Sequence, residues 1–203
     1  MKKLKIAFLA GTAGLLTGCL VTSVCPYYLQ KDVTFEPGLL GSWTNAKEEG
    51  EHWKFEREST NAYQLTYTSD GKSSVMKAHF FKLGENSFLD MFSAQEIPDV
   101  QPPPIPSHFL LRVFQVKPAP RMAALNYDWL QNHLAKDPAA LRHYVITNEN
   151  NADDTRLVLT AETADLQQFI LKHLKTEAAW KDDFELKRDS SDKESETKSS
   201  SIK

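Results

Sequence analysis

The chain has 203 residues, with 24 Lys or Arg against 27 Asp or Glu, and a formal net charge of −3 at pH 7. Nucleic-acid binding depends on Lys and Arg contacts to phosphates, so an acidic chain without a basic stripe argues against that class of partner. The length is sufficient for one domain with a sizeable core.

The N-terminus begins with Lys2, Lys3 and Lys5, followed by an apolar run over residues 6–16. About 20 apolar residues are needed to cross a bilayer as a helix, so this run is too short to span one. A basic start followed by a short apolar run is typical of a secretory signal peptide. We therefore expect this segment to be a targeting signal that is cleaved off.

The apolar run ends in Leu16-Thr17-Gly18-Cys19, which resembles the lipobox of bacterial lipoproteins. The resemblance implies a signal peptide over residues 1–18, cleavage before Cys19, and lipid attachment at Cys19 that anchors the mature chain to a membrane. Stable anchoring needs more than one acyl chain. Because Leu20 follows Cys19, the resemblance favours a cell-envelope location on the outer membrane facing the periplasm. The alternative is an ordinary secretory peptide with a chance cysteine.

Both ends of the mature chain are expected to lie outside the folded domain. We expect residues 19–36 to form a tether, in which Cys25 is incidental; the alternatives are a free thiol and an intermolecular disulfide partner. Residues 185–203 are dominated by Ser, Lys, Glu and Asp, with little to bury, and predict a disordered charged tail. The remaining residues, 37–184, form the predicted single domain.

The first half of this domain shows the period-two alternation of strands. The alternating runs are His52–Arg57, 62–68, 75–83 and Asn86–Ser93. Asp70-Gly71 and Gly84-Glu85 supply turns between them, because Gly accepts the positive φ values of tight hairpins. Consecutive strands joined by turns predict an antiparallel meander.

The second half mixes strands with two helices. Residues 99–106 contain four prolines and predict a rigid connecting loop. A strand covered on both faces is expected at 108–116, and Pro118 and Pro120 break it before 122–125. Two further strands are expected at 144–148 and 157–161. Asn126 is a good N-cap for a helix over 127–136. Residues 163–175 place Leu166, Phe169 and Ile170 on one face, which predicts an amphipathic helix.

Gly41-Ser42-Trp43 opens the predicted meander. A Gly-x-Trp on the first strand of an up-and-down barrel resembles the lipocalin family. The fold class expected from this is mainly β (β+α): an antiparallel meander that forms a lipocalin-like barrel or a strongly curved sheet, with two packing helices. The resemblance implies a structural role for Gly41 and Trp43 at the floor of the barrel.

Two adjacent strands would point their apolar side chains into such a barrel. The resulting ligand-cavity candidates are Trp53, Phe55, Tyr63, Leu65 and Tyr67. An aromatic-lined cavity suits a small apolar ligand, with the two tyrosines as polar handles. The same residues can equally fill an ordinary core, because barrels of about eight strands occur in both states. Alternation alone leaves both readings open.

Motifs for a reaction are missing from the sequence. Nucleophile, phosphate-loop, dinucleotide and zinc-protease patterns do not occur, and the six histidines lack metal-ligand spacing. His79 and Asp90 lie on neighbouring predicted strands, and His108 begins a buried one. We expect no catalytic residue, no metal, no cofactor and no enzyme activity. The two functions expected are a lipid-anchored binder of a small apolar ligand and a structural lipoprotein that binds another envelope protein.

Overall fold

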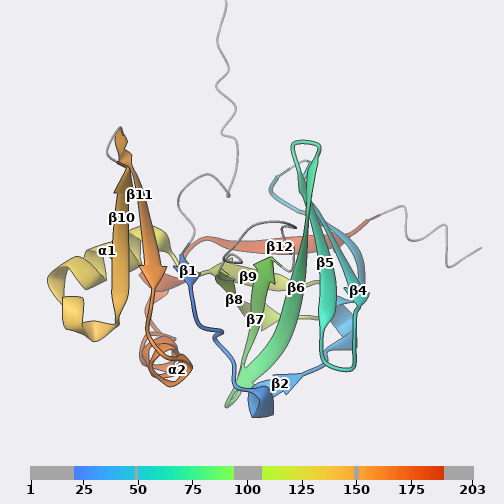
Figure 1. The fold of residues 1–203 in the computed structure, drawn as a ribbon. Coiled ribbons are helices and arrows are strands. Elements are labelled where there is room, and N and C mark those ends of the chain that lie inside the picture. Colours follow the sequence, from blue (N-terminus) through green and yellow to red (C-terminus); the bar gives the residue numbers. More distant parts are fainter. Residues whose placement is uncertain (1–20, 49, 94–106, 149–150, 190–203) are drawn as a thin grey trace, which may run out of the picture.

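The computed structural model describes residues 21–48, 50–93, 107–148 and 151–189 (Figure 1). Its centre is a closed, antiparallel, eight-stranded β-barrel. The barrel strands are β3 (Gly41–Asn45), β4 (His52–Arg57), β5 (Tyr63–Ser69), β6 (Lys72–Leu83), β7 (Asn86–Ser93), β8 (His108–Gln115), β9 (Arg121–Ala124) and β12 (Asp183–Arg188). The structure therefore confirms the mainly β class and decides between the two predicted forms in favour of the closed barrel.

Closure depends on the last strand, β12. It pairs antiparallel with β9 through Asp183–Glu185 and with β3 through Leu186–Arg188. The expected boundary of the charged tail, residue 185, was therefore wrong, because 185–188 belong to the barrel. Only Phe184 and Leu186 of this strand are buried, and two apolar side chains among charged neighbours gave too weak an alternation. Residues 190–203 lie outside the described residues.

The meander itself follows the predicted order of strands and turns. The β5–β6 hairpin turns at Asp70 and Gly71, whose φ values are +50° and +71°. Both values lie in the left-handed region, which Asp and Gly tolerate better than other residues, so this pair sets the turn. From this turn, the register runs Ser69 opposite Lys72 to Tyr63 opposite Ala78.

Much of the segment expected to be a tether is packed into the fold. From Val21 onward it forms β1 (Thr22–Ser23), a 3₁₀ turn at Gln30–Asp32, β2 (Val33–Thr34) and a second 3₁₀ turn at Pro37–Leu39. β1 pairs with β8 and β11, and β2 pairs with β6. Tyr27 is fully buried. The folded domain thus begins at least as early as Val21, not at residue 37.

A second layer lies beside the barrel (Figure 1). It contains the hairpin of β10 (His143–Asn148) and β11 (Asn151–Leu159), the helices α1 (Tyr127–Lys136) and α2 (Thr163–Lys172), and 3₁₀ turns at Pro138–Ala140 and Glu177–Ala179. β1 joins this hairpin to the barrel sheet, so the strand order runs β10-β11-β1-β8. The predicted N-cap of α1 is confirmed, since the Asn126 side chain accepts a hydrogen bond from the Trp129 amide at 2.8 Å.

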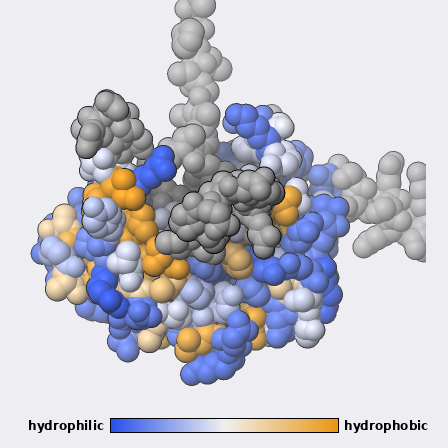
Figure 2. Space-filling view, viewed as in Figure 1, coloured by the Kyte–Doolittle hydropathy of each residue, from blue (hydrophilic) through white to orange (hydrophobic). Residues whose placement is uncertain are grey.

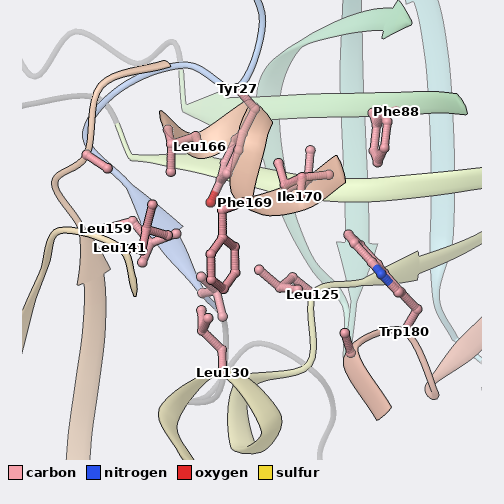
Figure 3. Close-up of a cluster of buried hydrophobic side chains, with 14 of the residues drawn as sticks. Tyr27, Phe88, Leu125, Leu130, Leu141, Leu159, Leu166, Phe169, Ile170 and Trp180 are labelled. Carbon is pink, nitrogen blue, oxygen red and sulfur yellow. The ribbon is translucent and has the colours of Figure 1, made fainter. Parts of the chain in front are cut away.

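Two separate hydrophobic cores result. One lies inside the barrel. The other lies between the outer wall of the barrel and the second layer (Figure 3). The outer core joins Leu166, Phe169 and Ile170 of α2 to Tyr27 and Trp180. β8 serves both, with Leu110 in the outer core and Leu111 in the inner one, as expected of a strand covered on both faces. Residues 1–18, Cys19 and the proline-rich loop at 99–106 lie outside the described residues.

Candidate functional site

The five predicted ligand-cavity residues come together inside the barrel. Alternation in β4 and β5 turns them inward, and all five belong to the inner core. Their exposed fractions are 7% for Trp53, 1% for Phe55, 0% for Tyr63, 0% for Leu65 and 4% for Tyr67. The sequence thus identified which side chains point inward.

Aromatic rings follow one another along the barrel interior. Ring centroids lie 5.7 Å apart between Phe184 and Trp53, and 6.3 Å apart between Trp53 and Phe55. The series continues from Phe55 to Tyr63 at 6.1 Å and from Tyr63 to Phe35 at 4.7 Å. These spacings are those of rings in mutual contact. These rings therefore line the barrel interior as a continuous series of contacts.

One end of the barrel is covered by residues 35–39. The Tyr63 hydroxyl donates to the Glu36 carbonyl at 3.0 Å and accepts from the Glu36 amide at 2.6 Å. Phe35 stacks on the Tyr63 ring, and the Arg57 guanidinium lies 3.6 Å from the centroid of the Phe35 ring. Burial raises the pKa of Tyr63 to about 12. This hydroxyl is thus committed to the backbone and is not a free handle for a ligand.

The predicted floor residues lie near this covered end. Gly41 has φ +110°, which glycine adopts most readily. The Trp43 side chain is buried, and its Nε1 donates to the Leu39 carbonyl at 2.8 Å. From β12, the Arg188 guanidinium lies 4.3 Å from the Trp43 ring centroid and donates to the Leu40 carbonyl. Trp43 therefore links the first strand, the last strand and residues 37–40.

A buried carboxylate that the sequence did not single out lies at the opposite end of the interior. Glu51 is 2% exposed and accepts from the Tyr67 hydroxyl at 2.8 Å and from Asn45 Nδ2 at 2.9 Å. Burial, together with the hydrogen bond to Glu51, raises the pKa of Tyr67. Glu51 follows Glu48, Glu49 and Gly50, so in the sequence it resembled part of a solvated acidic loop.

One polar atom in this region is unsatisfied. Trp53 Nε1 is buried and has no hydrogen-bond partner among the described residues. Buried donors are paired in the great majority of native sites. Trp53 Nε1 is therefore the one observation inside the barrel that favours an additional polar group, such as a water molecule or the polar end of a ligand.

The histidines singled out in the sequence lie on the outer wall of the barrel. His79 and Asp90 are opposite each other in the register, as expected, but the Asp90 carboxylate contacts other groups. Its Oδ1 lies 2.7 Å from Nδ1 of His108, and its Oδ2 accepts from the Tyr27 amide at 2.9 Å. His79 Nδ1 instead lies 3.1 Å from the Asn61 carbonyl. The Asp90–His108 pair is buried under the N-terminal segment.

The β10–β11 hairpin presents an exposed apolar surface. Tyr144, Val145 and Ile146 on β10 are 65%, 45% and 47% exposed. In Figure 2 hydrophobic colouring runs along this hairpin. β10 is also the edge of its sheet, since in the described part of the chain it pairs only with β11. An unprotected edge with apolar side chains is a template for another strand.

Several kinds of site do not occur in the described ranges. No group of three or more His, Cys, Asp or Glu is arranged to hold a metal ion, and no helix there has the length and apolar character needed to cross a bilayer. Comparison with known proteins gave no match to any protein-family model, any curated protein or any solved structure.

Proposed function

We propose that this chain is a lipid-anchored protein of the bacterial cell envelope, on the outer membrane facing the periplasm, whose barrel is a filled scaffold and whose β10 edge binds another envelope protein. The exposed edge formed by Tyr144, Val145 and Ile146 is the observation that carries the protein-binding part. The chain of ring contacts inside the barrel supports the scaffold part.

The packed N-terminal segment gives the proposal a spatial consequence. Cys19 precedes Val21 by two residues, which span at most about 7 Å of extended chain. Val21 is itself buried in the outer core. A lipid on Cys19 would therefore hold the domain against the membrane surface, and the partner must be reachable there.

The β10 edge would take up a partner by strand addition. The backbone groups on the outer side of β10 would pair with an extended segment, while Tyr144 and Ile146 on one face and Val145 on the other would contact its side chains. The strand His143–Asn148 contains no Pro and no Lys, the residues that commonly protect edges.

A test of the protein-binding part uses a photo-crosslinking amino acid in cells. Placed at Tyr144, it is expected to capture one discrete envelope protein, and Ile146→Lys should abolish that product. The matched control is the same probe at Leu171 of α2, which is 44% exposed. The captured protein, once purified, must bind the wild-type chain and not the Ile146→Lys variant. Equal products at Tyr144 and Leu171 would contradict the proposal.

The anchor is tested separately with the two cysteines of the sequence. Labelled palmitate is expected to enter the wild-type protein and a Cys25→Ala variant, and not a Cys19→Ala variant. The Cys19→Ala chain should also change its processing or leave the membrane fraction. Unchanged membrane partitioning of that variant after a high-salt wash would refute lipid anchoring through Cys19.

Binding of a small apolar ligand is the second candidate function, and the unpaired Trp53 Nε1 is the observation that favours it. Such a ligand would have to displace rings that now touch one another. Native mass spectrometry of the purified protein, followed by organic extraction, tests this. A discrete bound apolar molecule would show that the barrel carries a ligand and is not a filled scaffold.

A further inference from the structure

A cationic groove lies on the outer wall of the barrel, and none of its lining residues belongs to β10. Its volume is about 540 Å³, within the range of small-molecule sites. We call it the arginine groove and define it by six lining residues from β8, β9 and the segment after α2: Arg112, Phe114, Arg121, Lys175, Trp180 and Lys181. Four of the six carry a positive charge. Glu177 and Asp183 also line it, which leaves an excess of two positive charges.

Arg112 is the central cation of the arginine groove. Its Nη1 donates to the Leu174 carbonyl at 2.6 Å, and its Nη2 lies 3.4 Å from Asn86 Oδ1. Both acceptors are neutral, and in the described part of the chain no ion pair involves this guanidinium. Burial lowers the pKa of Arg112. The guanidinium is thus partly removed from water without a carboxylate to compensate its charge.

Arg121, the other arginine of the groove, differs from Arg112 in its ion pairing. Arg121 Nη1 lies 3.0 Å from Asp183 Oδ2, so its charge is already paired. Both guanidinium groups face the same ring, at 4.8 Å from Arg112 and 4.9 Å from Arg121 to the Phe114 centroid. Phe114 therefore lies beside two cations, of which Arg112 has no ion-pair partner among the described residues.

Trp180 supplies a second aromatic wall. Its ring centroid lies 5.6 Å from the Arg112 guanidinium carbon. The indole Nε1 donates to the His173 carbonyl at 3.1 Å, and the side chain is 5% exposed, so its orientation is fixed by packing. A ligand in the groove would meet a fixed cation between two aromatic side chains.

We propose that the arginine groove binds a small ligand in which a carboxylate or phosphate is attached to a flat apolar group. Guanidinium forms two parallel hydrogen bonds to such oxyanions and stacks on flat groups. Lys175 and Lys181 add charge at the rim without fixing geometry. This site is independent of the lipid anchor and of the β10 edge. The competing explanation is that Arg112 serves only to hold the Leu174 carbonyl.

The test uses four probes on the full chain in a neutral detergent: phenyl phosphate, benzoate, inorganic phosphate and acetate. Binding is measured by calorimetry and by the shift of the Trp180 indole resonance in NMR spectra. Phenyl phosphate or benzoate is expected to bind about tenfold more tightly than the matching ion without a ring, since ring stacking contributes about 1 kcal/mol or more. The ranking of the two aromatic probes tells whether phosphate or carboxylate is preferred.

Variants then distinguish binding from a structural role. Arg112→Gln should lower the affinity for the aromatic probes about tenfold or more. Arg112→Lys, which keeps the charge, should recover only part of that affinity. Lys181→Gln should weaken them about threefold. Lys187→Gln on the exposed side of β12, outside the groove, is the matched control and should bind as the wild type does.

Two results would overturn the proposal. One is that no probe binds with a dissociation constant below about 10 mM. The other is that Lys181→Gln and whichever Arg112 variant folds both bind the aromatic probes with wild-type affinity. The Leu174 carbonyl is held by Arg112, so a substitution at the rim lysine Lys181 keeps the test decisive if both Arg112 variants fail to fold.

Discussion

Oδ1 of Asp90 on β7 lies 2.7 Å from Nδ1 of His108 on β8, and the same carboxylate accepts a hydrogen bond from the Tyr27 amide. Asp90 is 0% exposed and His108 is 7% exposed. The pair joins two barrel strands to the N-terminal segment, 63 residues away from Asp90 in sequence. It is thus one of the polar connections between the barrel and the N-terminal segment, beside the two Tyr63–Glu36 hydrogen bonds.

We predict that Asp90→Asn lowers the free energy of unfolding by about 3 kcal/mol, because the substitution replaces the carboxylate at the centre of a buried hydrogen-bond network by a neutral amide. Urea unfolding at neutral pH measures the change. Glu185→Gln makes the same chemical change at an exposed position of β12 and should shift the free energy of unfolding by less than about 0.5 kcal/mol. Equal effects of the two substitutions would contradict the structural role of Asp90.

The ring contacts inside the barrel predict a large cost for removing one of the central rings. Phe55 is 1% exposed and contacts both Trp53 and Tyr63. Phe55→Ala should lower the free energy of unfolding by about 3–5 kcal/mol, the cost of deleting a buried ring and leaving a cavity. Denaturant unfolding measures it, and Leu171→Ala on the surface is the control. A change below about 1 kcal/mol would indicate a loosely packed interior, as a ligand carrier would have.

Closure by β12 predicts a sharp boundary for C-terminal truncation. A chain that ends at residue 189 keeps all of β12 and should unfold cooperatively with nearly unchanged stability. A chain that ends at residue 184 loses Leu186 and the pairing with β3, which leaves two open sheet edges. We expect that chain to aggregate or to lose cooperative unfolding, as followed by circular dichroism and gel filtration. Folding of the shorter chain would show that closure is dispensable.

Sequence patterns predicted the elements whose partners are close in the chain. β4 was predicted with its observed bounds, and α1 with its cap, because alternation and Asn126 are local signals. β12 and the packing of the N-terminal segment were missed, since their partners lie far away in sequence: Leu186 pairs with Asn45, and Thr22 with Val158. Local composition carries no information about such pairings.

In the candidate site, too, the sequence predicted the local features and not the long-range contacts. The inward direction of Trp53 and Phe55 could be read from alternation, whereas the contact of Trp53 with Phe184 depends on how the barrel closes. Whether the interior is filled therefore could not be decided from the sequence. The arginine groove escaped notice for a similar reason, because Arg112 and Lys181 come together only through the tertiary fold.

Alkaline pH should lower the stability of the protein by ionising the buried tyrosine at the covered end of the barrel. Burial raises the pKa of Tyr63 to about 12, above about 10 in the unfolded chain. A raised pKa means that the fold favours the neutral phenol, so its contribution is complete below about pH 10 and is lost as the pH rises towards 12. The stability of the wild-type protein should therefore fall across this window.

Tyr63→Phe isolates that contribution. At neutral pH the variant should lose about 1–2 kcal/mol, because the two hydrogen bonds to the Glu36 backbone are gone. From about pH 9.5 to 11.5, its stability should fall less steeply than that of the wild type, because one of the tyrosines whose pKa is raised by folding is absent. Leu171→Ala, at a 44% exposed position, leaves every tyrosine in place and should keep the wild-type slope. Urea unfolding across this range measures all three, and a Tyr63→Phe slope equal to the wild-type slope would show that the Tyr63 phenol ionises freely in the folded protein.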